Sequence, residues 1–173
     1  MGKRGQVWVE TVIYTLIGLT IIGLVLAAAL PKIEEKKDAI AIEQSIDVVR
    51  VIDKMIYDVV NKGIGNRRVV DLEIRKGSMV IDMEKNEISW ILDSSFAYSE
   101  IGLPVSLGGL YVTTSEANPF EIELKLEYDG DIRFNNETTG TKIITIAPTP
   151  YKFIIENIGV SEEGNTIINL LAN

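Results

Sequence analysis

The chain has 173 residues, a formal net charge of −8 and no histidine. This length allows one long helix and one modest domain with its own hydrophobic core. The negative charge and the lack of a basic stripe argue against nucleic-acid binding. The sequence has no cysteine, which excludes disulfides and thiolate metal sites.

An apolar segment near the N-terminus is the most informative feature of the sequence. Residues 11–30 contain no charged residue, and Glu10 lies directly before them. In an α-helix, a segment of this length spans about 30 Å, the thickness of a bilayer hydrocarbon core. An acidic side chain at the centre of a membrane helix costs about 2.5–3.5 kcal/mol on insertion scales, and ionisable groups in such helices tend to be functional. We therefore expect a membrane-spanning helix over residues 6–30 and a specific role for Glu10.

The residues around the start of this segment resemble those of type IV prepilins, in particular the archaeal pilin-like group with a class III signal peptide. Lys3, Arg4, Gly5, Gln6 and Glu10 carry the resemblance, which covers roughly residues 3–33. It implies a leader of residues 1–5 that a prepilin peptidase removes by cutting between Gly5 and Gln6. It also implies that Glu10 neutralises the new N-terminal amine of a neighbouring subunit during assembly. Loss of Lys3 and Arg4 would change the formal net charge from −8 to −10.

The charges on either side of the apolar segment predict its orientation. Lys3 and Arg4 precede it, which places the N-terminus in the cytoplasm by the positive-inside rule. Lys32, Lys36 and Lys37 on the other side weaken this prediction, but the short leader cannot carry a folded domain across the membrane. The resemblance then implies a precursor in the cell membrane with its head outside, and a mature form in an extracellular, adhesive surface filament. The implied partners are the membrane, the prepilin peptidase and other pilin subunits.

Two other readings of the apolar segment remain open. It is longer than the apolar core of an ordinary secretory signal peptide, although Ala27, Ala28 and Ala29 before Pro31 resemble a cleavage site. It also suits a plain signal anchor, with Glu10 at the level of the lipid headgroups. The candidate functions are therefore a pilin, major or minor, a membrane-anchored β domain that binds an extracellular ligand without polymerising, and a secreted soluble protein that has lost its first thirty residues.

A helical pattern continues beyond the apolar segment and predicts an amphipathic extension over residues 31–65. Pro31 predicts a kink or a brief break. Gly63 and Gly65 are expected to end the helix. The residues that share one face at steps of three and four are Ile42, Ile46, Val49, Asp53, Ile56 and Val60, with Ile52 and Val59 beside them. This face packs either in a filament, in the core of the following domain, or in both.

Residues 66–173 change to a strand-like pattern and predict an extracellular β-rich head. Short runs with period-two alternation are separated by turn residues, which favours an antiparallel β-sandwich-like domain. Asp129 and Gly130 predict a hairpin, Pro148 and Pro150 an edge or a crossing, and residues 94–109 a long loop. The expected strands are 69–75, 79–83, 88–92, 110–114, 120–128, 132–134, 142–146, 151–156 and 166–171. The predicted fold class is α+β, with a long N-terminal hydrophobic helix before this head.

The sequence offers little catalytic chemistry, so we expect no enzyme activity, no cofactor and no metal site. Glu121, Glu123 and Glu127 alternate along one strand and predict a solvated strand face. Asn136 begins the sequence Asn-Glu-Thr, which is an N-glycosylation acceptor motif in a turn-like region. The sequence therefore suggests Asn136 as a site of N-glycosylation.

Overall fold

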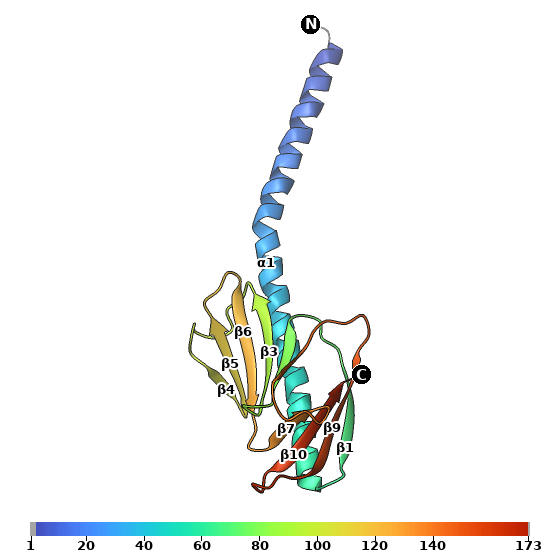
Figure 1. Cartoon of the computed structure of the whole chain (residues 1–173). Helices are drawn as coiled ribbons and strands as arrows, with labels where there is room; N and C mark the ends of the chain where they lie inside the picture. The colour runs from blue at the N-terminus through green and yellow to red at the C-terminus, as the bar shows by residue number, and fades with distance from the viewer. Residues whose placement is uncertain (1–2, 173) are drawn as a thin grey trace. The chain divides into compact units, whose positions relative to one another are not determined.

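The computed structural model describes residues 3–172, with side chains from residue 8 onward, and Figure 1 shows the arrangement of its elements. The chain divides into two units, Met1–Lys37 and Asp38–Asn173, and each is described by itself. Helix α1 covers Lys3–Lys62 and contributes to both. The strands in the described residues are β1 Arg67–Leu72, β2 Ser78–Asp82, β3 Glu87–Ser94, β4 Val105–Leu107, β5 Leu110–Ser115, β6 Phe120–Glu127, β7 Asp131–Phe134, β8 Thr141–Ile144, β9 Tyr151–Val160 and β10 Thr166–Ala172.

The first unit consists of the N-terminal part of helix α1. The helix continues through Pro31, so the brief break considered for this position does not occur. Proline removes a single backbone donor, and the neighbouring helical hydrogen bonds can persist around it. Directly after Pro31, Lys32 forms an ion pair with Glu35, with an N–O distance of 2.7 Å.

The second unit contains two β-sheets. One has four strands in the order β1-β9-β10-β7, and the other has six in the order β4-β5-β6-β3-β2-β8. Among the strands of residues 3–172, every pair is antiparallel except β7 with β10, which is parallel. The predicted α+β class with a β-rich head is therefore confirmed, while a wholly antiparallel head is wrong for this one pair.

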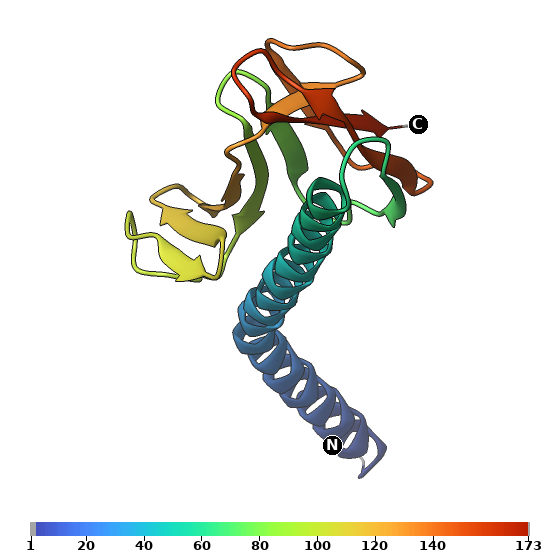
Figure 2. The same ribbon diagram turned by 90° about the horizontal axis from the view of Figure 1, so that it is seen from below.

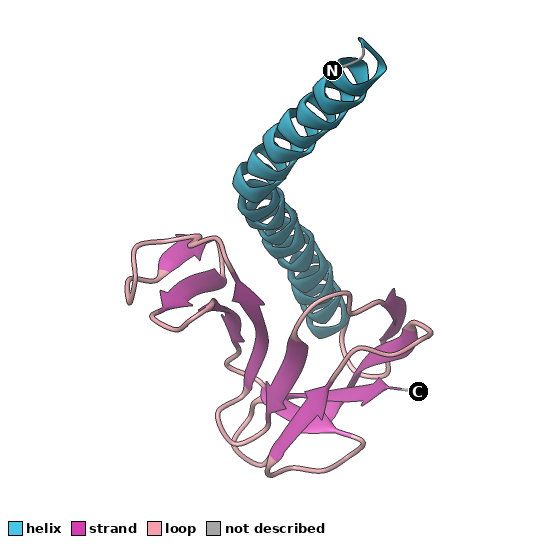
Figure 3. Cartoon of the chain, turned by 90° about the horizontal axis from the view of Figure 1, so that it is seen from above, coloured by secondary structure: helices cyan, strands magenta, loops and turns pink. Residues whose placement is uncertain are grey.

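The helical stretch from Asp38 onward shares one hydrophobic core with both sheets. Its buried apolar side chains are Ile42, Ile46, Val49, Ile52, Ile56 and Val59. Figures 2 and 3 show the last turns of α1 beside strands of both sheets. The strands contribute large side chains such as Trp90 and Phe153, which are fully buried. This stretch of helix is thus part of the core of the β-rich unit, one of the two packing roles expected for it.

The buried face of the helix differs slightly from the predicted row. Ile52 and Val59 are buried in the core, whereas Asp53 and Val60 lie at its edge. Asp53 accepts a hydrogen bond of 3.1 Å from the hydroxyl of Tyr128 on the segment after β6. A carboxylate stays at the edge because full burial would strip it of water. The helix ends at Lys62, and Gly63 and Gly65 follow with φ of 86° and 85°.

The nine predicted strands all have counterparts, and the errors concern the connections. The hairpin predicted at Asp129 and Gly130 is wrong, because β6 pairs with β3 and β5 whereas β7 pairs with β10 in the other sheet. A Cβ on Gly130 would lie 2.9 Å from the carbonyl oxygen of Thr166, so this glycine permits a close backbone approach. Pro148 and Pro150 lie between β8 and β9 and mark a crossing between the sheets, as expected.

The segment predicted as a long loop contains a strand. β4 lies within residues 94–109 and forms the edge of the six-stranded sheet beside β5. All three of its residues are exposed or half-buried, so it has no alternation of buried and exposed positions. β9 also extends beyond the predicted end at Glu156 to Val160, where it pairs with Thr166 of β10.

Candidate membrane span and assembly segment

Among the described residues, α1 is the one helix that is long and apolar enough to cross a membrane, and its apolar part lies near the N-terminus. Between Trp8 and Leu30 nearly every side chain is exposed, including Trp8 and Tyr14 at 71%, Leu24 at 67% and Leu19 at 62%. These residues fall on all faces of the helix, so no single stripe faces a protein core. A helix that is apolar all round is stable when lipid or other helices surround it.

Two hydroxyl groups within this stretch are satisfied by the helix itself. Thr15 donates its hydroxyl to the carbonyl of Thr11, and Thr20 to that of Leu16, each at 2.8 Å. Such bonds to the preceding turn allow hydroxyls to reside in hydrocarbon. Gly18 and Gly23 have nothing within 4 Å of an added Cβ apart from their own helix. Packing within the chain therefore does not require either glycine.

Glu10 lies on an exposed face of the helix, at the start of the uncharged stretch. The predicted cleavage residues Gly5 and Gln6 lie within α1, one turn before it. The side chains of Lys3, Arg4 and Gln6 lie outside the described part of the structure, as do Met1 and Gly2 entirely.

Asn136 lies in the exposed turn between β7 and β8, at a φ of 66°. The turn is held by its backbone: the N–H of Asn136 donates to Oδ1 of Asn169 at 2.9 Å, and that of Asn135 to the carbonyl of Leu170 at 2.9 Å. Asn169 is 1% exposed and lies in β10. The acceptor motif is thus presented on an ordered, accessible turn. No signal in the sequence pointed to Asn169 as its support.

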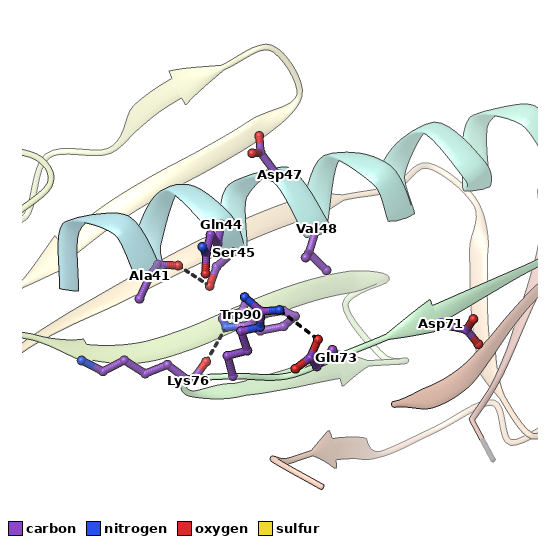
Figure 4. A pocket seen from close by; sticks show the side chains of 10 residues that line it. Ala41, Gln44, Ser45, Asp47, Val48, Asp71, Glu73, Lys76 and Trp90 are labelled. Carbon is purple, nitrogen blue, oxygen red and sulfur yellow. Dashed lines mark hydrogen bonds and ion pairs between the residues drawn. The ribbon is translucent and has the colours of Figure 1, made fainter. Parts of the chain in front are cut away.

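The seam between α1 and β1 contains a groove that the sequence did not reveal. A hollow of about 380 Å³ is lined by Ala41, Gln44, Ser45, Asp47 and Val48 from the helix and by Asp71, Glu73, Arg75, Lys76 and Trp90 from the strands and their connections. Figure 4 shows Gln44 and Ser45 facing Trp90 across this hollow. The indole N–H of Trp90 donates to the carbonyl of Lys76 at 3.0 Å. Trp90 is 2% exposed and so forms the floor.

Asp38 holds two connections of the β-rich unit against the helix. It accepts hydrogen bonds from the backbone N–H and the hydroxyl of Ser95, and it pairs with the ammonium of Lys76. Partial burial raises the pKa of the Asp38 carboxyl, but the hydrogen bonds from Lys76 and Ser95 outweigh that effect and leave the pKa below its ordinary value. The sequence showed Asp38 as one more charge on a wet helix face, because its partners lie far away in the chain.

The row of glutamates on β6 behaves as a solvated face. Glu121, Glu123 and Glu127 alternate with buried Ile122, Leu124 and Leu126. Lys125 pairs with the carboxylate of Glu127 at 2.6 Å. Within the described residues, no group of three or more acidic side chains is placed to hold a metal ion. This surface therefore offers charge but no convergent site.

Comparison with protein-family models, with curated proteins and with solved structures finds no match to this chain.

Proposed function

We propose that this chain is a structural subunit, a major or minor pilin, of an archaeal type IV pilus-like surface filament. The observation that carries the proposal is the apolar helix over residues 8–30, exposed on all faces, with Glu10 at its start. As a precursor the chain spans the cell membrane once, with its N-terminus in the cytoplasm and its head outside. A prepilin peptidase removes residues 1–5, and the exposed helix then packs against those of other subunits.

The membrane and the interior of a filament would both surround the helix with apolar groups, which supports this proposal. Lipid covers residues 8–30 in the precursor, and neighbouring helices would cover them in a filament. Because lipid and leucine side chains are similarly apolar, helix association depends on close packing. Gly18 and Gly23, which have open space around them, would let helices approach closely.

The role that we assign to Glu10 follows from the cost of burying charge. Cleavage creates an ammonium at Gln6, and an unpaired ammonium inside a helical bundle is strongly disfavoured. A carboxylate on an adjoining subunit neutralises it and is neutralised in turn. Breaking a buried ion pair by removing one partner costs about 3–5 kcal/mol. The proposal assigns the chain no catalytic step.

Replacement of Glu10 tests the proposal. Glu10→Ala is expected to leave insertion and cleavage intact but to abolish filaments, counted by electron microscopy of intact cells. Glu43→Ala is the matched control, because Glu43 is an exposed glutamate of the same helix beyond the uncharged stretch. If Glu10→Ala cells make filaments as well as Glu43→Ala cells, the proposed role of Glu10 is wrong.

A membrane-anchored β domain that never polymerises is the other function compatible with one membrane span. It requires the apolar helix but assigns Glu10 no specific partner, only a place at the level of the lipid headgroups. Such a domain would retain residues 1–5 and stay in the membrane fraction. Purification of the protein from that fraction alone, without filaments from the unaltered chain, would favour the anchored domain.

A further inference from the structure

The groove between α1 and β1 extends further than the hollow above Trp90. A second hollow of about 250 Å³ adjoins it and shares Asp47, Val48 and Asp71. Its remaining lining is apolar and consists of Val51, Ile52, Val70 and Leu72. Val51 is 44% exposed there although it lies beside the hydrophobic core. The result is a continuous groove with an apolar floor at one end.

The two banks of this groove carry negative charge that the chain itself does not neutralise. Glu73 pairs with Arg75 at 3.2 Å, and Lys76 pairs with Asp38. Asp47 on the helix bank and Asp71 on the strand bank have no ion-pair partner among residues 8–172. Covering these carboxylates with an apolar or acidic surface would remove their water without compensation. An occupant that fits the groove must therefore bring apolar side chains together with positive charge.

Among the residues whose side chains the structure describes, an exposed helical segment at residues 33–37 has that combination. Ile33 is 48% exposed, and Lys37 lies four residues later on the same helix face. Lys36 is its exposed neighbour, and neither lysine has an ion-pair partner in the described part of the chain. A second exposed basic pair on the helix, Arg50 and Lys54, lies beside exposed Val51, but Val51 itself lines the groove, so that segment belongs to the groove.

We propose that the groove binds residues 33–37 of a second copy of this chain. Ile33 of that copy fills the apolar hollow beside Val51, and its Lys36 and Lys37 face Asp47 and Asp71. This contact rests on the proposed filament, in which copies lie side by side. It joins the head of one subunit to the helix of the next and adds a charge-selective contact to the packing of the apolar helices.

Cross-linking between differently labelled copies tests the contact, and the natural sequence contributes no competing thiol because it lacks cysteine. One copy carries Ile33→Cys and the other Val51→Cys, and both are expressed together in cells that make filaments. A short bismaleimide is expected to give about tenfold more mixed dimer than the control pair, because neighbours held in contact react at high effective concentration. The control pairs Ile33→Cys with Ser115→Cys, an exposed residue at the end of β5.

Charge exchange gives a second, independent measurement. Asp71→Lys and Lys37→Glu are each expected to reduce the mixed dimer to the level of the control pair, and the two changes together to restore it. Filaments without preferential cross-linking between the thiols introduced at positions 33 and 51 would overturn this contact and leave the proposed function standing. If the unaltered chain is never found as a polymer, both the contact and the proposed function fail.

Discussion

Asp38, on helix α1, accepts two hydrogen bonds from Ser95, one from the backbone N–H at 2.7 Å and one from the hydroxyl at 2.9 Å. The two residues are 57 positions apart in the chain. Ser95 directly follows β3, and Lys76, which pairs with the same carboxylate, lies just before β2. One side chain thus fixes the helix to the connection between the two sheets, from β1 to β2, and to the connection that follows β3.

Replacing Asp38 by asparagine tests the strength of this connection. Asp38→Asn keeps the shape of the side chain but removes its charge, and we expect a loss of about 1.5 kcal/mol in the free energy of unfolding. Urea unfolding of the full chain in detergent, followed by tryptophan fluorescence, measures the loss. Asp93→Asn is the control, because Asp93 is exposed on β3. Equal stability of the two variants would contradict the proposed importance of Asp38.

The lowered pKa of Asp38 also predicts a dependence on pH. Its folded-state pKa lies below the ordinary value of 3.8, so the ionised form is favoured by folding. The stabilisation that ionised Asp38 contributes is fully present above pH 3.8 and is lost as the pH falls through the folded-state pKa. The difference in stability between the unaltered chain and Asp38→Asn should therefore be constant near neutral pH and shrink below pH 3.8. A difference that persists unchanged into strong acid would contradict the assignment.

Tyr128 is expected to resist ionisation in the folded protein. Burial raises the pKa of its phenol far above the usual value, and the nearby Asp53 carboxylate raises it further. Absorbance titration at alkaline pH should therefore give the same signal for the unaltered chain and for Tyr128→Phe until the protein unfolds. If the unaltered chain shows one more ionised tyrosine than Tyr128→Phe before it unfolds, Tyr128 ionises in the folded state and the prediction is wrong.

Gly77 is expected to tolerate no side chain. A Cβ there would lie 2.2 Å from the carbonyl oxygen of Ile91 and 2.8 Å from the Cβ of Leu92, and its φ is +81°. Gly140 has a similar φ of +91° but open space around it. Gly140→Ala should cost about 1–2 kcal/mol for the backbone conformation alone. Gly77→Ala should cost about 1–3 kcal/mol more, because backbone and core must also move. Equal urea midpoints for the two variants would refute this difference.

Glycosylation of Asn136 is expected if the head lies outside the cell, because the turn that carries it is exposed. The intact mass of protein from its own cells should then exceed the mass of its polypeptide by one glycan. Asn136→Gln should remove that excess and leave the fold unchanged, because the turn is held by backbone N–H groups. An unaltered chain with the bare polypeptide mass would contradict the prediction.

The sequence predicted the elements of the fold better than their connections. The alternation in β6 and the helical spacing from Ile42 to Val59 are local patterns that depend on which face is buried. The path from β6 to β7 is not local: Asp129 and Gly130 have the composition of a hairpin, but the close approach of Thr166 to Gly130 suits a crossing between sheets. β4 was missed because neither of its faces is buried.

The same difference between neighbouring and distant residues applies to the candidate site. Glu10 and the apolar helix are contiguous in the sequence and could be identified from it. The contacts of Asp38 with Ser95 and of Asn136 with Asn169 join residues that are 57 and 33 positions apart. The groove beside Val51 likewise exists only once α1 and β1 have packed together. No pattern of charge or hydrophobicity along the chain predicts such pairings.

The most direct test of the filament proposal is the N-terminal sequence of the protein recovered from its own cells. Mass spectrometry of the N-terminal peptide should read Gln-Val-Trp-Val-Glu, beginning at Gln6, in protein sheared from the cell surface. A chain that begins at Met1 or Gly2 and stays in the membrane would contradict the proposal and favour an anchored domain. A chain that begins near Lys32 would contradict it in favour of a secreted protein.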